Sequence, residues 1–133
     1  MKDLVATVWK YLDAQQIDKL EPYFTPGTEF RMPGGTFRGL GEFRAMAEAW
    51  WAAFPDLRHE IVTELNGGDI YACELVMTGT HSGTLHTPKG PLPATGKKVR
   101  MLSADFMRIR EGRIVTWNAY PDLVGLFAQL GVE

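Results

Sequence analysis

The chain has little of several features that mark whole classes of protein. Its 133 residues contain one cysteine, Cys73, which excludes an internal disulfide and a thiolate metal cluster and favours a reducing, cytoplasmic environment. No apolar run approaches the roughly 20 residues that span a bilayer, and the N-terminal segment, with Lys2 and Asp3, does not resemble a secretory signal. The 14 basic and 16 acidic residues are scattered, so neither a nucleic-acid groove nor a membrane-binding patch is predicted.

Motifs for cofactors are also missing. The chain has no glycine-rich dinucleotide fingerprint and no P-loop. Its three histidines, His59, His81 and His86, lack the close carboxylate or cysteine spacing of a zinc or iron site. We therefore predict a protein without a cofactor or metal, whose partner is a small molecule or another protein chain.

What the chain does have is a helical first half and a strand-rich second half, in a composition that is 45% hydrophobic. This order predicts one compact α+β domain, with helices on one face of an antiparallel sheet. Apolar residues at helical spacing predict helices over 4–12 and 40–54, and Asp122 is the predicted N-cap of a last helix. The predicted extended segments are 28–32, 57–65, 70–80, 99–110 and 113–120.

The turn between the last two strands sets how they pair. Arg110, Glu111 and Gly112 suit a three-residue loop whose final glycine takes the left-handed conformation. A two-residue turn of Glu111 and Gly112 would flip the pairing, and we disfavour it because glutamate is a poor first residue for such a turn.

The three-residue loop places Asp105 opposite Trp117, among apolar residues on one face of the sheet. The other pairs predicted on this face are Ser103 with Ala119 and Met107 with Val115. The opposite face, which is expected to meet solvent or another subunit, carries Phe106, Arg108, Thr116 and Asn118.

A series of short motifs along the chain resembles one known family. The motifs are Phe54-Pro55-Asp56-Leu57, Gly67-Gly68-Asp69, Gly79-Thr80-His81-Ser82-Gly83, Ala94-Thr95-Gly96-Lys97, Arg110-Glu111-Gly112-Arg113-Ile114-Val115, Trp117 with Asp122, and Gln129-Leu130-Gly131. Each motif alone is weak, but their order and spacing resemble the SnoaL-like polyketide cyclases of the nuclear-transport-factor-2-like superfamily. The resemblance implies one SnoaL-like domain over residues 1–133.

This resemblance implies a cone-shaped fold, in which a curved antiparallel sheet wraps around helices and encloses an apolar cavity. It also implies a homodimer through the outer face of the sheet. The superfamily includes steroid isomerases and limonene epoxide hydrolases as well as cyclases, so the fold alone does not define the reaction.

The chain departs from the cyclase pattern at the acid/base position. In the cyclases an aspartate precedes an aromatic-Pro-Asp sequence in the last strand, whereas here that residue is Ala119. An epoxide hydrolase also needs an aspartate there, and Met32 stands where the steroid isomerases place their base. The resemblance places Ser103 and Asp105 where the cyclases have a glutamine and a histidine that help line the pocket.

Asp105 is therefore the predicted proton shuttle. A carboxylate in an apolar cavity is desolvated, so its pKa rises toward the neutral range, where it can take a proton from a carbon acid and return it. Trp117 is expected to form an apolar wall, and His81 or Ser103 to hydrogen-bond a developing enolate oxygen. The alternatives are a structural Asp105, satisfied by a neighbouring histidine or arginine, and a structural His81 that closes the end of its strand.

The remaining predicted cavity residues come from the apolar faces of the elements and are Met32, Trp50, Phe54, Met107 and Ala119, with His59 at the cavity mouth or on the surface. Trp50 and Trp51 are about 100° apart on their helix, so we expect one in the core and the other at the cavity or a dimer contact. The loop 82–98 is expected to cover the cavity entrance or to reach a neighbouring subunit.

These observations favour a cofactor-independent enzyme, a cyclase or isomerase, that acts on an apolar, carbonyl-bearing, polyketide-like small molecule. Asp105 and His81 are its predicted catalytic residues. The alternatives are a non-catalytic protein that sequesters a hydrophobic ligand in the same cavity, and an epoxide-hydrolase-like enzyme with a relocated carboxylate.

Overall fold

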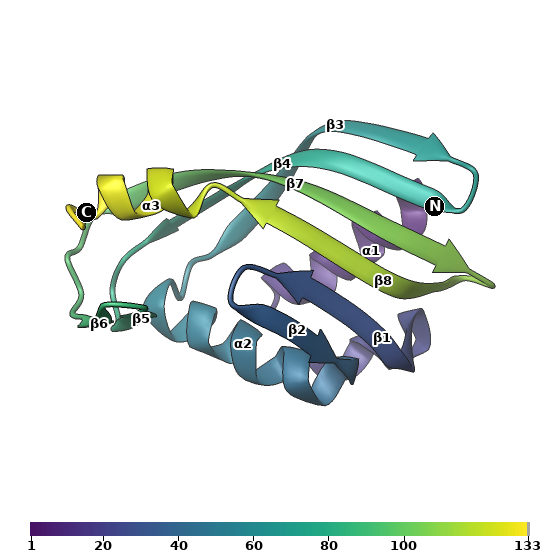
Figure 1. The fold of residues 1–133 in the computed structure, drawn as a ribbon, viewed down its shortest axis with the longest axis horizontal. Coiled ribbons are helices and arrows are strands. Elements are labelled where there is room, and N and C mark those ends of the chain that lie inside the picture. Colours follow the sequence, from purple (N-terminus) through teal and green to yellow (C-terminus); the bar gives the residue numbers. More distant parts are fainter. Residues whose placement is uncertain (133) are drawn as a thin grey trace.

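A curved six-stranded sheet arches over two helices in the computed structural model, which describes residues 1–132 (Figure 1). The helices are α1 (Lys2–Asp13), the 3₁₀ helix η1 (Ile17–Tyr23), α2 (Gly39–Ala53) and α3 (Leu123–Gln129). The strands are β1 (Phe24–Met32), β2 (Gly35–Arg38), β3 (Arg58–Gly67), β4 (Ile70–Thr80), β5 (Leu85–Thr87), β6 (Gly90–Leu92), β7 (Lys98–Arg110) and β8 (Arg113–Pro121). None of the helices within residues 1–132 has the length and apolar run that a membrane crossing requires.

The sheet is open, with its strands in the order β2-β1-β8-β7-β4-β3. The predicted α+β architecture is confirmed, although one pair of neighbours, β1 and β8, runs parallel. The short strands β2, β5 and β6 were not predicted, because three or four residues are too few to show a period of two. β5 and β6 form a separate small hairpin within the loop 82–98.

The turn between β7 and β8 differs from the predicted one. Arg110 pairs directly with Arg113, so the turn has only two central residues, Glu111 and Gly112. Both adopt positive φ, 51° and 74°, as a type I′ turn requires. The prediction was wrong because it gave the glutamate's conformational preference more weight than the match between this turn and the twist of the strands.

A β-bulge then restores the predicted face of the sheet. Pairing shifts between Arg108 and Ile109, which leaves Val115 of β8 as an extra residue. The two-residue turn moves the register by one position and the bulge by one more. Because side chains alternate with a period of two, a total shift of two residues leaves Asp105 on the inner face. Its partner, however, is Ala119 and not Trp117.

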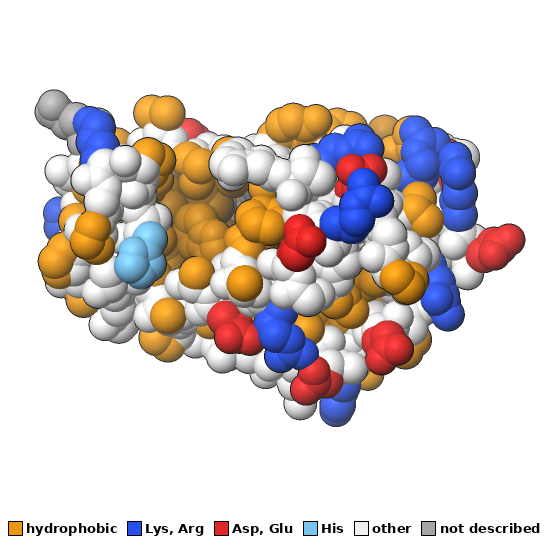
Figure 2. All heavy atoms as spheres, turned by 60° about the horizontal axis from the view of Figure 1, so that its bottom comes forward, with side chains coloured by type: hydrophobic (Ala, Val, Ile, Leu, Met, Phe, Trp, Pro, Cys, Tyr) orange, Lys and Arg blue, Asp and Glu red, His pale blue; other side chains and the backbone are white. Residues whose placement is uncertain are grey.

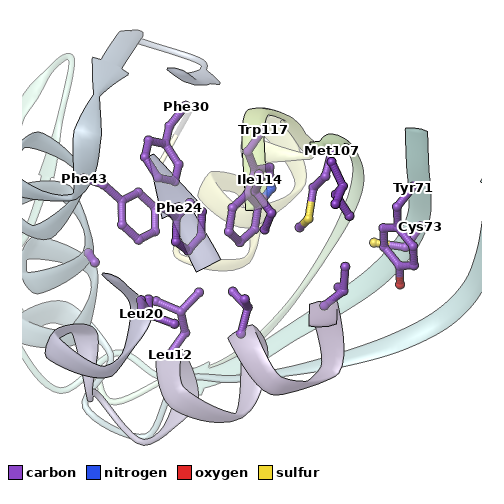
Figure 3. Packing of buried hydrophobic residues seen from close by; sticks show 14 of the residues in the cluster. Leu12, Leu20, Phe24, Phe30, Phe43, Tyr71, Cys73, Met107, Ile114 and Trp117 are labelled. Atoms are coloured by element: carbon purple, nitrogen blue, oxygen red, sulfur yellow. The ribbon is translucent and has the colours of Figure 1, made fainter. Parts of the chain in front are cut away.

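Aromatic rings build the core beneath this sheet (Figure 3). Trp117 is 1% exposed, and its ring centroid lies 6.0 Å from those of Phe30 and Phe43 and 6.3 Å from that of Phe24. α1 closes the core from below through Val5, Val8 and Leu12, which are all buried and share one helical face. The inner face of β7 and β8 is thereby held against two helices.

Asp122 begins α3 as predicted. Its side chain accepts a hydrogen bond from the backbone N–H of Gly125 at 2.9 Å, which satisfies one of the free donors at the helix start. This cap turns the chain away from β8, so that Leu123 of α3 reaches the cavity described below.

The loop 82–98 docks on the end of α2. The backbone N–H groups of Ser82 and Gly83 both donate to the carbonyl oxygen of Ala53, at 3.0 and 3.1 Å. Leu85 is buried in a second apolar cluster with Phe54. None of the loop's residues lines the cavity. In this structure the loop packs against the C-terminal end of α2.

Gly83 is the point where this loop comes closest to α2. A Cβ atom added at Gly83 would lie 1.9 Å from the carbonyl oxygen of Ala52, a contact that only movement of the backbone relieves. We expect Gly83→Ala to lower the free energy of unfolding by about 1–3 kcal/mol, measured by urea denaturation. Gly67→Ala is the matched control, because nothing lies within 4 Å of its added Cβ. Equal stabilities of the two variants would contradict the close docking of the loop.

Candidate active site

An apolar cavity of about 180 Å³ lies between the inner face of the sheet and the helices. Figure 2 shows a recess lined by hydrophobic side chains on the face that α2 borders. Nearly all of its lining is aliphatic, aromatic or methionine, and three polar side chains interrupt it: His59, Ser103 and Asp105. An apolar pocket with a few convergent polar groups is the usual form of a small-molecule site.

Most of the predicted cavity residues line this space. They are Met32, Trp50, His59, Ser103, Asp105, Trp117 and Ala119. Three predicted residues do not line it, namely Phe54, Met107 and His81. Met107 is fully buried in the core, and Phe54 is fully buried against Trp50, with ring centroids 5.8 Å apart.

Asp105 is the buried charge of the cavity. Its residue is 2% exposed, and each carboxylate oxygen accepts one hydrogen bond. The Ser103 hydroxyl donates to Oδ1 at 2.6 Å, and the indole Nε1–H of Trp117 donates to Oδ2 at 2.9 Å. The predicted role of Trp117 as an apolar wall was therefore incomplete, because this side chain also orients the carboxylate.

Burial raises the pKa of Asp105 above its ordinary value, while the hydrogen bonds from Ser103 and Trp117 and the charge of His59 act in the opposite direction. The alternative in which a neighbouring arginine satisfies this carboxylate does not hold among the described residues. Arg108 binds the two oxygens of Asp69 at 3.0 and 2.8 Å on the outer side. Among the described residues Asp105 has neutral hydrogen-bond donors and no lysine or arginine partner.

His59 reaches the cavity from β3. Its ring Nδ1 lies 2.7 Å from Oδ1 of Asp13, and its backbone N–H donates to Oδ2 of the same carboxylate at 3.0 Å. Its ring also stacks on Trp9, with centroids 4.2 Å apart. Asp13 and Trp9 were not among the predicted site residues, because no local pattern links α1 to a strand that begins more than 40 residues later.

His81 directly follows β4 and is buried on the predicted side of the sheet, but it does not line the cavity. It is fully buried, and its Nδ1 lies 2.9 Å from the Thr95 hydroxyl and accepts from the Thr95 backbone N–H at 3.2 Å. Its backbone carbonyl accepts from Gly96. The prediction that His81 contacts the substrate is corrected, because the strand carries it past the cavity to the loop 82–98.

Trp50 and Trp51 both line the cavity and both are half-buried, so the expectation that one of them belongs to the core was wrong. The cavity runs along α2 from Phe43 to Trp51 and contacts both tryptophans at its C-terminal end. The methionines Met46, Met77 and Met101 were also missed as lining residues. Their unbranched side chains suit a wall that adapts to ligands of different shapes.

Cys73 pairs with Asp105 across β4 and β7 but is chemically inert. Burial, and next the charge of Asp105, raise the pKa of its thiol to about 12, so the nucleophilic thiolate does not form at neutral pH. No group of three or more histidine, cysteine, aspartate or glutamate side chains suited to a metal lies within residues 1–132.

The fold and the cavity together define a class: a cone-shaped α+β protein with an apolar cavity and a buried carboxylate in its wall. A family model of the SnoaL-like polyketide cyclases matches residues 2–130. The chain belongs to this family, as its motifs had indicated.

Individual relatives agree with this assignment. Aklanonic acid methyl ester cyclase DauD from Streptomyces sp. (strain C5) is 32% identical over 114 residues, which cover 84% of this chain and 66% of that cyclase. IdmH from Streptomyces antibioticus, a polyketide cyclase candidate, is 27% identical with a TM-score of 0.85 over 98% of both chains. A SnoaL-like cyclase candidate from Jannaschia sp. CCS1 shares the fold at 16% identity, with a TM-score of 0.86 over 98% of this chain and 91% of its own.

Proposed function

We propose that this protein is a cofactor-independent cyclase or isomerase that moves a proton on an apolar, carbonyl-bearing, polyketide-like substrate. The observation that carries the proposal is the carboxylate of Asp105, buried in the wall of an apolar cavity and held by two neutral donors. A carboxylate in such a place is a stronger base than one in water, because its charged form is poorly solvated. The cyclase names of its relatives support the same reaction class.

The pairing of β7 and β8 supports Asp105 as a substitute for the family's usual aspartate. Asp105 lies directly opposite Ala119, the position at which the resemblance expects the acid/base residue. Opposite residues in an antiparallel pair have Cβ atoms about 4.5–5.5 Å apart. A carboxylate that moves from β8 to β7 at this pair therefore serves the same region of the cavity.

In the proposed reaction the Asp105 carboxylate removes a proton from a carbon next to a carbonyl group and leaves an enolate. In a cyclase the enolate carbon attacks a second carbonyl of the same molecule, a carbon–carbon bond forms, and the new alkoxide takes up the proton. In an isomerase the proton returns to another carbon. Either route ends with the proton back on the substrate, so neither consumes a co-reactant.

The simplest test measures enolisation without requiring the natural substrate. 2-Tetralone, a bicyclic ketone with acidic C1 hydrogens, is incubated with the protein in D2O, and deuterium at C1 is followed by NMR. The proposal expects exchange faster than in buffer for the wild type and its loss in Asp105→Asn. Equal rates in the two proteins would refute Asp105 as the base.

The outer face of the sheet supports a second proposal, a homodimer. Leu102, Phe106 and Tyr120 are 51%, 44% and 60% exposed on this face, an unusual exposure for large apolar side chains. We expect light scattering to give twice the chain mass of 14.9 kDa, and Phe106→Glu to give the single mass. Val124→Glu is the control, because Val124 is 82% exposed and belongs to helix α3 and not to a strand of the sheet. A wild-type mass near 15 kDa would contradict the dimer.

A further inference from the structure

His59 and Asp13 form a hydrogen-bonded pair at the wall of the cavity. Both residues come from the first half of the chain, whereas Asp105 comes from β7. The Asp13 carboxylate engages both the ring Nδ1 and the backbone N–H of His59, so the imidazole is held in one orientation. Both side chains are shielded, 14% exposed for His59 and 19% for Asp13. An exposed surface pair of this kind would be loosely held, whereas this one is anchored at the end of α1.

Trp9 holds the ring from a second direction. Its indole stacks on the His59 ring at an interplanar angle of 28° and meets Trp117 edge-on, with centroids 5.2 Å apart. The imidazole thus has its Nδ1 occupied by Asp13 and one face covered by Trp9. Because His59 lines the cavity, Nε2 is the ring nitrogen that remains for a ligand.

The same cavity wall holds a second unused donor. The Nε1–H of Trp9 is buried, and no acceptor for it lies among the described residues. Trp9 lines the cavity, so a ligand oxygen is the acceptor that the site can supply. Two groups on stacked rings of the cavity wall, Nε2 of His59 and Nε1 of Trp9, therefore have no hydrogen-bond partner among the described residues.

We propose that His59 is the second proton-transfer group of this site, a general acid that protonates the substrate's carbonyl oxygen while Asp105 takes the carbon proton. Asp13 is its positioning residue, and Trp9 contributes a hydrogen bond to the same oxygen. This inference rests on the proposed function, because it assigns the partner of the base that the function requires.

The proton balance closes without a co-reactant. Asp105 gains the proton that leaves carbon, and protonated His59 gives its Nε2 proton to the carbonyl oxygen as the charge develops there. In cyclisation this oxygen is the acceptor carbonyl that becomes a hydroxyl. The proton on Asp105 then returns to His59 through the product hydroxyl or cavity water, which restores both groups for the next turnover.

The charges around His59 favour this division of roles. Asp13 faces it from α1 and Asp105 from β7, while its partner on β4, Met77, is apolar and its neighbours Arg58 and Glu60 point to solvent. The described charged groups that face the ring are thus two carboxylates, and none of them is a lysine or an arginine. In return, the charge of His59 opposes part of the rise that burial causes in the pKa of Asp105, which stays above its ordinary value.

The experiment compares His59→Gln with the wild type in the 2-tetralone exchange assay across pH. We expect His59→Gln to lower the exchange rate about 100-fold and to abolish the fall in rate at high pH, where the wild-type imidazole loses its proton. Affinity for 2-naphthol, an analogue of the enol, is measured from tryptophan fluorescence and is expected to change less than the rate. His86→Gln is the matched control, because His86 is exposed and does not line the cavity.

Asp13→Asn tests the positioning role with His59 still present. Asparagine retains an oxygen for the ring N–H but loses the negative charge, so the high-pH limb is expected to move to lower pH. If His59→Gln keeps both the wild-type rate and the limb while Asp105→Asn is inactive, His59 is not the acid and the proposed function stands. If Asp105→Asn exchanges deuterium like the wild type, the proposed function itself fails. If His59→Gln does not fold, the Asp13→Asn variant decides: a fall in exchange rate at the same high pH as in the wild type overturns the inference.

Discussion

Asp105→Asn is expected to slow deuterium exchange into 2-tetralone by about 100-fold or more, the usual contribution of a positioned general base. Asparagine has nearly the shape of aspartate and can still accept from the Trp117 indole while it donates to the Ser103 hydroxyl. It has no basic oxygen, so the cavity persists and the proton acceptor is lost. The rate is measured by NMR at several pH values, and an unchanged rate would contradict the assigned role.

The same variant, Asp105→Asn, is expected to be more stable than the wild type at neutral pH, although its exchange rate is lower. Burial raises the pKa of Asp105 above its ordinary value of 3.8, so the folded state binds this proton more tightly than the unfolded chain. The stabilising contribution of the protonated form is complete below pH 3.8 and is lost as the pH rises through the raised pKa. We therefore expect Asp105→Asn to have a higher Tm than the wild type at neutral pH, with the difference shrinking under acid conditions. A lower Tm at neutral pH would show that the asparagine disturbs packing, and the kinetic result would then need Ser103→Ala as a second comparison.

Trp117→Ala is expected to lower the free energy of unfolding by about 3–5 kcal/mol, the usual cost of emptying a large aromatic site. The ring packs against three phenylalanines and Trp9, and it is the largest fully buried side chain of the protein's described part. Its removal also leaves Oδ2 of Asp105 without a donor. Urea denaturation measures the change.

Val124→Ala serves as the control for this truncation, because Val124 is 82% exposed and its loss is expected to change stability by less than about 0.5 kcal/mol. A Trp117→Ala variant within about 1 kcal/mol of the wild type would mean that the aromatic cluster around β8 is not a principal part of the core.

The alternation of residues in the strands explains how much of the site could be predicted. Asp105 was expected on the inner face, and it lies there even though the predicted partner was wrong. The face depends only on parity, and the two-residue turn together with the bulge at Val115 preserved it. The partner depends on the number of residues in the turn and on the bulge. The length of the turn rests on a small conformational preference of one residue, Glu111, which here adopts positive φ.

His81 shows where the same reasoning fails. The alternation of residues along β4 correctly predicted that its side chain, one residue past the strand, is buried, but the position along the chain decides what a buried side chain contacts. The cavity ends before this point, and Thr95 of the following loop contacts the ring Nδ1 of His81. Curvature of the sheet and the path of a 17-residue loop, 82–98, set this outcome, and neither has a local signal in the sequence.

The sequence by itself determined the α+β class, the order of the main helices and strands, the cap at Asp122, and the presence of a carboxylate on the inner face. These follow from hydrophobic periodicity and turn chemistry, which act between residues close together in the chain. Only the tertiary structure decided that Asp13 orients His59, that Trp117 donates to Asp105, and that both adjacent tryptophans of α2 border one cavity. Such contacts join segments that are far apart in the sequence and meet only when the curved sheet packs over its helices. Spacing along the sequence therefore could not predict them.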